Sequence, residues 1–287
     1  MRSILFSPAD DIKKMIKARS SQADGLIYDL EDSVTFDRKP FARDCLKEFL
    51  GDCNRPRNIW VRINSLDTGF LEADLKAAAV KLVSGIILPK CRTGEDVEHV
   101  KTHLAQSEKE AGLLQGSMQI IPIATEVPEA LFHINKIAKA SRVWGITWGA
   151  EDLAAAVGAY GNKNANGELT PVFEHARTMC LLAARAAGVE PIDAPSMILN
   201  DDEALIEECR RARFDGFSGK LAIHPKQIAA IHAAFTPSEE EVQFAQTIIE
   251  AFSDNPNSGA FQLNGQMIDM PHLKMANNIM KLSAYTK

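Results

Sequence analysis

The chain has 287 residues, of which 46% are hydrophobic and 24% are charged. This composition is typical of a folded globular protein and excludes a largely disordered chain. The 32 Lys and Arg against 38 Asp and Glu give a formal net charge of −6, without a basic tail or stripe, which argues against a protein that binds nucleic acid or an anionic membrane through bulk charge.

The cysteines and the N-terminal residues indicate the compartment. The cysteines are scattered, without a CxxC pair or a Cys/His cluster, so they predict neither a disulfide framework nor a structural zinc site. They are Cys45, Cys53, Cys91, Cys180 and Cys209. No apolar run approaches the ~20 residues of a membrane span, and Asp10 and Asp11 follow the first apolar run too soon for a signal peptide. We therefore expect a cytoplasmic protein.

Short apolar runs rich in β-forming residues alternate with amphipathic segments of helical length. The runs cover residues 4–7, 25–30, 59–63, 85–88, 118–124, 143–148, 190–194 and 216–223. The predicted helices cover 11–21, 38–50, 71–83, 94–111, 129–140, 171–187, 201–213 and 226–235. Fully apolar strands joined by helices are typical of a parallel sheet. The even alternation favours an α/β fold of the (β/α)8 TIM-barrel type over a doubly wound open sheet.

A further helical segment follows the predicted barrel. Pro237 and Ser238 come after the last barrel helix, and Ser238 is a predicted N-cap with Glu241 three residues later, the spacing of a capping box. We therefore expect a barrel domain over residues 1–236 and a short C-terminal helical segment over residues 237–287.

Polar residues follow nearly every apolar run. In a TIM barrel these positions lie at the carboxyl ends of the strands, where the active site is found. The clearest pair is Glu126 and Asp152, which follow consecutive strands. Two carboxylates with room for water are the environment that Mg²⁺ prefers, so this pair predicts a magnesium site. An acidic residue taken alone at such a position is more often a helix N-cap than a metal ligand.

Other residues at this end leave two interpretations open. Arg62 lies between two apolar residues of a buried strand, where it either binds an anion or forms a buried ion pair with Asp29 or Glu31. The small residues Gly149 and Ala150 expose backbone N–H groups to a substrate carboxylate, or simply form a strand-to-helix turn.

Short motifs in a fixed order cover nearly the whole chain. They are Arg2-Ser3 to Pro8, Asp29-Leu30-Glu31-Asp32-Ser33-Val34, Lys39 with Ala42-Arg43, Val61-Arg62-Ile63-Asn64, Leu88-Pro89-Lys90, Thr125-Glu126, Gly149-Ala150-Glu151-Asp152-Leu153, Gly219-Lys220 with Ile223-His224-Pro225-Lys226-Gln227, and Gly265-Gln266-Met267-Ile268-Asp269. In these motifs the chain resembles the citrate lyase beta-subunit-like family of the HpcH/HpaI aldolase superfamily, whose members are TIM barrels.

The resemblance implies a Mg²⁺-dependent carbon–carbon lyase. Its substrate would be a β-hydroxyacyl-coenzyme A (CoA) thioester such as citramalyl-CoA or malyl-CoA, and its products acetyl-CoA and pyruvate or glyoxylate. Position by position, Glu126 and Asp152 match the metal ligands, and Arg62 matches the residue that binds the 2-oxo acid. The backbone of Gly149 and Ala150, with Asp152, would bind the rest of that acid.

The resemblance also implies roles away from the metal. The C-terminal segment resembles a lid that closes over a neighbouring subunit, in a homotrimer or a hexamer, and Asp269 matches the acid/base residue that the lid delivers there. Lys17 and Lys90 would contact CoA. A solvated helix face is the alternative for Lys17, which lies near Lys13 and Lys14 on the first predicted helix.

Three other functions are compatible with the same residues. One is the citryl-acyl-carrier-protein lyase subunit of a citrate lyase complex. A second is a malyl-CoA thioesterase, in which water attacks the thioester. The third is a non-catalytic partner subunit, against which the presence of Arg62, Glu126, Asp152 and Asp269 argues.

Overall fold

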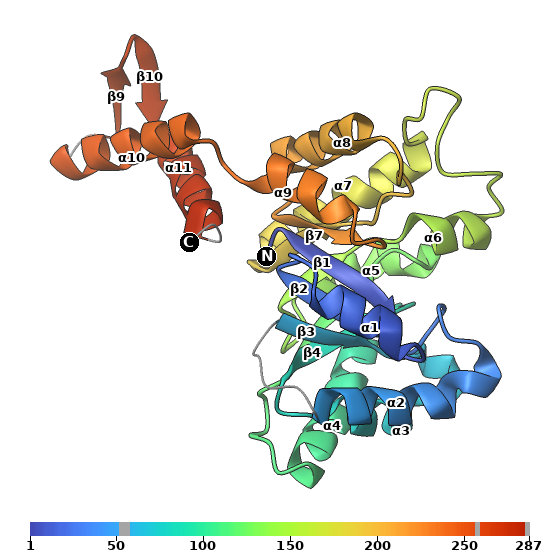
Figure 1. Ribbon diagram of the computed structural model, residues 1–287. Helices are drawn as coiled ribbons and strands as arrows, with labels where there is room; N and C mark the ends of the chain where they lie inside the picture. Colours follow the sequence, from blue (N-terminus) through green and yellow to red (C-terminus); the bar gives the residue numbers. More distant parts are fainter. Residues whose placement is uncertain (52–57, 256–258, 285–287) are drawn as a thin grey trace.

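The computed structural model describes residues 1–51, 58–255 and 259–284, and its main feature is a barrel of parallel strands surrounded by helices (Figure 1). The strands are β1 (Ser3–Pro8), β2 (Gly25–Asp29), β3 (Asn58–Arg62), β4 (Val83–Leu88), β5 (Gln119–Pro122), β6 (Gly145–Thr147), β7 (Glu190–Asp193) and β8 (Gly219–Ala222). Every apolar run of the sequence overlaps one of them. The predicted TIM barrel is therefore confirmed.

The strand order shows how the barrel closes. The sheet runs β5-β4-β3-β2-β1-β8-β7-β6, so its two edges are β5 and β6. Parallel bridges Ile120↔Val143 and Ile123↔Thr147 join these edges. At the second bridge the N–H of Ala124 donates to the carbonyl of Thr147 at 2.8 Å. Closure places β5 next to β6, and with them the residues that follow each strand.

Helices cover the outside of the barrel (Figure 1). They are α1 (Ile12–Arg19), α2 (Lys39–Gly51), α3 (Leu71–Ala78), α4 (Gly94–Glu110), α5 (Pro128–Ala138), α6 (Ala150–Val157), α7 (Pro171–Ala187), α8 (Asp202–Asp215) and α9 (Gln227–Phe235), with 3-10 turns at Phe36–Arg38 and Leu66–Thr68. In the described part of the chain, no helix has the length and apolar character needed to cross a membrane.

Two sequence-based boundaries were wrong by several residues, and one helix was missed. The predicted helix over 71–83 ends at Ala78, because Val83 already begins β4. The last run was predicted from residue 216, but Gly216 caps α8 with φ +116°, so β8 begins only at Gly219. No helix was predicted over α6, which is a short helix of 8 residues directly after the apolar run of β6.

Two apolar layers stabilise the barrel. The outer layer lies between the strands and the helices, and the inner layer fills the barrel itself. The inner layer includes Ile4, Ile27, Trp60, Ile87 and Leu221. Successive strand residues point to opposite faces, so strands that face apolar layers on both sides read as continuous apolar runs.

The C-terminal segment forms a small lobe with its own apolar core. It consists of α10 (Glu239–Asp254), the antiparallel pair β9 (Ala260–Leu263) and β10 (Gln266–Asp269), and α11 (Met270–Ser283). The purely helical segment expected from the sequence was therefore wrong in one respect, since it contains a hairpin. Asn264 and Gly265 form its turn with φ values of +49° and +82°, as a tight hairpin turn requires.

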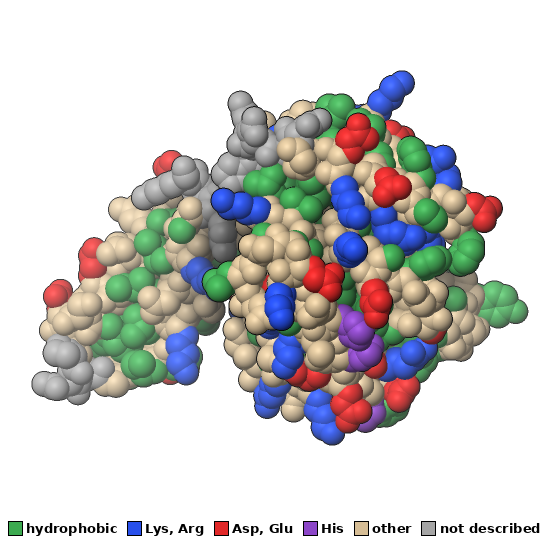
Figure 2. All heavy atoms as spheres, turned by 90° about the horizontal axis from the view of Figure 1, so that it is seen from below, with side chains coloured by type: hydrophobic (Ala, Val, Ile, Leu, Met, Phe, Trp, Pro, Cys, Tyr) green, Lys and Arg blue, Asp and Glu red, His purple; other side chains and the backbone are tan. Residues whose placement is uncertain are grey.

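The C-terminal lobe lies beside the amino ends of the barrel strands (Figures 1 and 2). Lys281 of α11 forms an ion pair with Glu190, the first residue of β7. Arg213 of α8 pairs with Glu241 of α10 at 2.9 Å. The lobe is thus at the opposite end of its own barrel from the carboxyl ends of the strands.

Candidate active site

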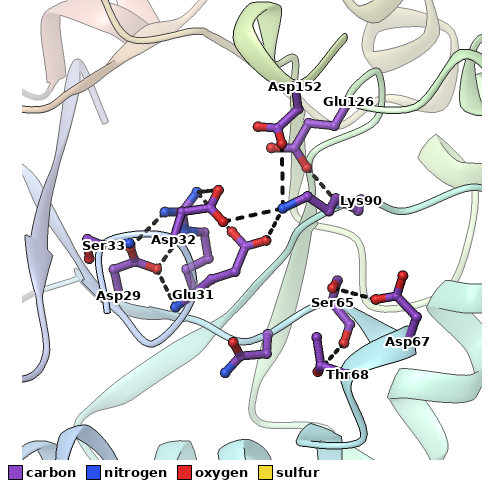
Figure 3. Close-up of polar contacts among 12 residues, drawn as sticks. Asp29, Glu31, Asp32, Ser33, Ser65, Asp67, Thr68, Lys90, Glu126 and Asp152 are labelled. Atoms are coloured by element: carbon purple, nitrogen blue, oxygen red, sulfur yellow. Dashed lines mark hydrogen bonds and ion pairs between the residues drawn. The ribbon is translucent and has the colours of Figure 1, made fainter. Parts of the chain in front are cut away.

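The carboxyl ends of β2 to β5 and the start of α6 bring together a cluster of charged side chains (Figure 3). The cluster contains Asp29, Glu31, Asp32, Arg62, Lys90, Glu126 and Asp152. Five carboxylates therefore face the two cationic side chains of this cluster, and the buried ammonium of Lys39 lies behind them, bonded to the carbonyls of Leu30 and Glu31. This excess of negative charge at the mouth of the barrel is the electrostatic environment in which a divalent cation is stabilised.

Arg62 is fixed by carboxylates on both sides. Its Nε and Nη2 donate hydrogen bonds of 2.6 Å to the two oxygens of Asp29, and its Nη1 lies 3.1 Å from Glu31. Burial alone would raise the pKa of Asp29, but the charge and hydrogen bonds of Arg62 outweigh it and lower that pKa. Of the two interpretations left open by the sequence, the structure shows the buried ion pair.

Lys90 faces the same carboxylates from β4. Its ammonium lies 2.5 Å from Glu31, 3.5 Å from Asp32 and 3.5 Å from Asp152 (Figure 3). Burial lowers the pKa of Lys90, but Glu31 and the other carboxylates outweigh this effect and raise it. The family resemblance implied a CoA contact for Lys90; in the structure its charge is directed into the acidic cluster.

Glu126 is a buried acidic residue whose carboxylate binds the backbone of Lys90. Its Oε2 accepts a hydrogen bond of 2.6 Å from the backbone N–H of Lys90, a residue with φ +50°. The side chain is 3% exposed. Burial, with the nearby charges of Glu31 and Asp152, raises the pKa of Glu126 to about 8. A carboxylate in this environment needs a further positive charge in order to ionise.

Gly149 provides the surface against which Glu126 packs. A Cβ at this position would lie 2.6 Å from Cγ of Glu126, so no larger residue fits without moving that side chain. The N–H of Gly149 donates to the hydroxyl of Thr125 at 3.1 Å. That N–H is therefore already bonded, and the first backbone donor of α6 open to a ligand is that of Ala150.

Glu126 and Asp152 together fit a Mg²⁺ ion. Asp152 is partly buried in the first turn of α6 and faces the ammonium of Lys90, while Glu126 accepts the hydrogen bond of the Lys90 backbone N–H (Figure 3). Among the described residues, no group of three or more His, Cys, Asp or Glu side chains is arranged to hold a metal ion. Mg²⁺ commonly takes one or two carboxylates and completes its coordination with water and substrate oxygens, so two protein ligands are sufficient.

Two residues named from the resemblance lie away from this cluster. Lys17 is exposed in the last turn of α1. Asp269 is the N-cap of α11, and its Oδ1 lies 2.6 Å from Nδ1 of His272. Since Asp269 belongs to the C-terminal lobe, it lies at the other end of its own barrel from Glu126.

The sequence pattern did not single out Trp148 or assign a role to Asp193. The indole N–H of Trp148 donates to Asp193 at 2.7 Å, and both residues are buried. Trp148 looked like an ordinary core residue of strand six. The sequence feature that could have indicated this contact is Asp193 itself. It is an acidic residue inside the apolar run of strand seven, where a buried charge needs a partner.

The chain is similar to proteins with known activities. A family model described as HpcH/HpaI aldolase/citrate lyase matches residues 2–225. The mitochondrial citramalyl-CoA lyase of Rattus norvegicus is 33% identical over 300 residues, which cover 100% of this chain and 87% of the relative. The (3S)-malyl-CoA thioesterase of Cereibacter sphaeroides is 31% identical over 278 residues, which cover 96% of this chain and 92% of the relative.

A solved structure has the same fold. The crystal structure of protein CitE from Mycobacterium tuberculosis, in complex with magnesium, acetoacetate and coenzyme A, is similar with a TM-score of 0.81 and 32% sequence identity. The similarity covers 99% of this chain and 98% of that chain. It therefore includes the C-terminal lobe as well as the barrel.

Proposed function

We propose a reaction for this chain, which belongs to the HpcH/HpaI aldolase/citrate lyase family. It is a Mg²⁺-dependent carbon–carbon lyase that cleaves a β-hydroxyacyl-CoA, with citramalyl-CoA or malyl-CoA as the first candidates, into acetyl-CoA and a 2-oxo acid. The observation that carries this proposal is the buried Glu126 beside Asp152, in an acidic cluster with too few cations of its own.

Glu126 and Asp152 would hold the metal ion. When bound, Mg²⁺ supplies a Lewis acid that stabilises negative charge on the oxygen of the emerging carbonyl group. Lys90 keeps the two carboxylates oriented, since its backbone N–H binds Glu126 and its ammonium faces Asp152. Ionisation of Glu126 is favoured when the metal ion adds its positive charge to those of Arg62 and Lys90.

Arg62 and the start of α6 would bind the 2-oxo acid. The guanidinium is held rigidly by Asp29, so it presents a fixed positive charge to the carboxylate or the carbonyl oxygen of the substrate. The N–H of Ala150 is a donor at the same end of the barrel. The substrate hydroxyl loses its proton as its oxygen becomes the carbonyl of the 2-oxo acid, and the electron pair of the broken carbon–carbon bond passes to the thioester enolate. The enolate carbon then accepts a proton, which balances the proton lost by the hydroxyl.

Asp269 would supply that proton to a neighbouring subunit. The C-terminal lobe lies against the amino ends of its own strands, so Asp269 serves a barrel mouth only if another copy of the chain provides it. The lobe has exposed apolar side chains for such a contact, among them Met267, Met270 and Met275. We therefore extend the proposal to a homo-oligomer, a trimer or a hexamer, with Lys17 near the CoA moiety.

The free cysteine thiols support a proposal for the cellular compartment. Cys45, Cys91, Cys180 and Cys209 are free and buried in the structure, while Cys53 lies outside the described residues. Free thiols that form no disulfide are compatible with a reducing compartment, which supports the cytoplasm as our proposal.

The test is an assay with Mg²⁺ and racemic citramalyl-CoA or malyl-CoA, in which the products are identified by mass spectrometry and EDTA serves as the control. Metal-dependent acetyl-CoA together with pyruvate or glyoxylate is the expected result. Free coenzyme A with intact malate would instead identify a thioesterase. No product from either thioester would favour a citryl-acyl-carrier-protein substrate or a non-catalytic subunit.

A further inference from the structure

We infer that the hydrogen bond between Trp148 and Asp193 is a clamp that positions Asp152 and Glu126 for the metal ion. Trp148 comes directly before Gly149, and Asp152 follows in the first turn of α6. Asp193 is the last residue of β7, on the neighbouring strand. The inference rests on the proposed metal-binding role of the two carboxylates and adds two positioning residues to it.

The start of α6 lacks the usual means of fixing a helix terminus. Its N-cap is Gly149, which has no side chain to bind the first N–H groups of the helix. In the described part of the chain, two hydrogen bonds hold the residues just before the helix, and Glu151 in its first turn accepts a third from Asn162. The N–H of Gly149 donates to Thr125 at 3.1 Å, and the indole N–H of Trp148 donates to Asp193 at 2.7 Å. Loss of either bond would release the segment that carries Asp152.

Asp193 is a rigid acceptor for the indole. Its Oδ2 accepts from Lys220 at 2.6 Å, and its Oδ1 also accepts from Arg177 at 3.4 Å. Burial alone would raise the pKa of Asp193, but Lys220 and Arg177 outweigh it and lower that pKa, so the carboxylate stays ionised. A buried polar network with all its members paired specifies one arrangement of the groups it connects.

The outer helices fix the network in turn. Lys220 lies 3.1 Å from Glu208 of α8, and Arg177 of α7 lies 2.6 Å from Asp215 at the end of α8. The indole is therefore tied, through Asp193, to the helical layer outside the barrel. The residues of this layer that hold Asp193 are not members of the charged cluster at the barrel mouth.

Trp148 is buried in the outer apolar layer, but packed side chains do not surround it on every side. A cavity of about 580 Å³ lies beside it, and both Trp148 and Asp193 line this cavity, as do Arg177, Lys220 and Ala150. Side chains next to a void make fewer contacts and move more easily. The directional hydrogen bond supplies the restraint that neighbouring atoms do not supply there.

A shift of Trp148 would reach both metal ligands. Gly149 follows Trp148 in the chain and packs against Cγ of Glu126. The side chain of Glu126 fits there only because Gly149 has no Cβ. Asp152 lies three residues further along. The clamp therefore controls the distance between the two carboxylates, and a small loss of alignment weakens metal binding without unfolding the barrel.

The experiment compares Trp148→Phe with the matched control Trp144→Phe. Phenylalanine keeps an aromatic ring but removes the indole N–H. Trp144 precedes the same strand and packs against Trp60 with ring centroids 5.5 Å apart. Mg²⁺ binding is measured by calorimetry, hydrogen exchange of the α6 amides is measured by mass spectrometry in the metal-free protein, and circular dichroism verifies folding.

We expect Mg²⁺ to bind about 10-fold more weakly to Trp148→Phe, at the lower end of the usual effect of losing an outer-shell contact, and the α6 amides to exchange faster. Trp144→Phe should match the parent protein in both measurements. Unchanged exchange and affinity in folded Trp148→Phe, or equal changes in both variants, would overturn the clamp. A parent protein that binds no Mg²⁺ would instead overturn the proposed metal site, and the exchange data would still decide the clamp.

A second measurement covers the case in which Trp148→Phe does not fold. The sequence contains three tryptophans, so the indole N–H signals of the parent protein can be assigned from Trp60→Phe and Trp144→Phe by elimination. We expect the Trp148 signal to exchange slowly with solvent and to shift when Mg²⁺ is added. Fast exchange of that signal would contradict the clamp.

Discussion

Arg62 and Asp29 form a two-pronged ion pair, with two N–H···O distances of 2.6 Å between the last residues of neighbouring strands. The planar guanidinium matches both oxygens of the carboxylate, which a lysine cannot do. Arg62 is therefore presented to the barrel mouth in one orientation, and its third nitrogen faces Glu31.

We expect Arg62→Lys to lower kcat/KM by about 100-fold or more, because the fixed donors next to the developing charge are lost. Steady-state kinetics on the metal-loaded protein measures this. Arg38→Lys is the control, since Arg38 pairs with Asp10 on the exposed surface. A loss of less than threefold in Arg62→Lys would show that the ion pair with Asp29 is purely structural.

Glu126→Gln should stabilise the metal-free protein, with an effect that depends on pH. The ordinary pKa of 4.5 is raised to about 8 in the folded chain, so between these values the folded state binds one more proton than the unfolded state. The stability contributed at this site therefore falls as the pH rises from about 4.5 to about 8.

Removing the ionisable group should raise the melting temperature at pH 8 by about 5 °C, which corresponds to about 2 kcal/mol for a chain of this size, and should change it little at pH 5. Calorimetry of metal-free protein at the two pH values measures the difference. The exposed Glu129→Gln is the control. The same shift at both pH values would contradict the raised pKa of Glu126.

Asp152→Asn should weaken Mg²⁺ binding by about 100-fold or more, because an amide oxygen replaces one of two charged ligands. Titration calorimetry with the metal alone measures this directly. Glu151→Gln is a matched control, as this neighbour points to Asn162 rather than into the cluster. Equal affinities of the two variants would place the metal ion elsewhere.

Gly149→Ala should disturb Glu126 without changing any charge. The added methyl group would lie 2.6 Å from Cγ of Glu126, which is well inside van der Waals contact. We expect at least about tenfold weaker Mg²⁺ binding as the carboxylate moves aside. Gly161→Ala, where a Cβ has open space, should leave the affinity unchanged. Normal metal binding by Gly149→Ala would mean that Glu126 is free to adapt.

Asp269→Ala should abolish carbon–carbon cleavage but leave Mg²⁺ and 2-oxo acid binding intact. If the lobe acts on a neighbouring subunit, mixed oligomers of Asp269→Ala and Asp152→Ala contain some sites with both intact residues. Turnover should therefore reappear when the two inactive variants are unfolded and refolded together. Failure of the mixture to regain activity, with oligomers verified by light scattering, would exclude a lid that acts between subunits.

The barrel could be predicted because each buried strand appears in the sequence as a short run of apolar residues. Each run of apolar residues became a strand, since a residue inside a parallel sheet faces a core on either side. The boundaries were less accurate at α3 and β8, where loops of a few residues carry apolar side chains like those of the elements themselves. The hairpin of the C-terminal lobe was missed, although Asn264-Gly265 was an available turn signal.

The partners of the charged residues could not be predicted. A buried arginine such as Arg62 needs an anion, but neighbouring sequence does not distinguish a carboxylate of the protein from one of a ligand. Lys90 likewise has its amide and its ammonium directed into the acidic cluster only because its backbone takes φ +50° at the end of β4. That conformation is not common for a lysine and has no clear signature in the sequence.

The sequence by itself determined the strand and helix order of the barrel, and it placed Glu126 and Asp152 at the same end, because the carboxyl ends of parallel strands meet there. Only the tertiary structure decided that Asp29 neutralises Arg62, that Asp193 holds Trp148 from 45 residues away, and that Asp269 lies at the far end of its own barrel. The reason is physical: periodicity and burial act on neighbouring residues, whereas these contacts depend on closure of the barrel and on where the chain leaves it.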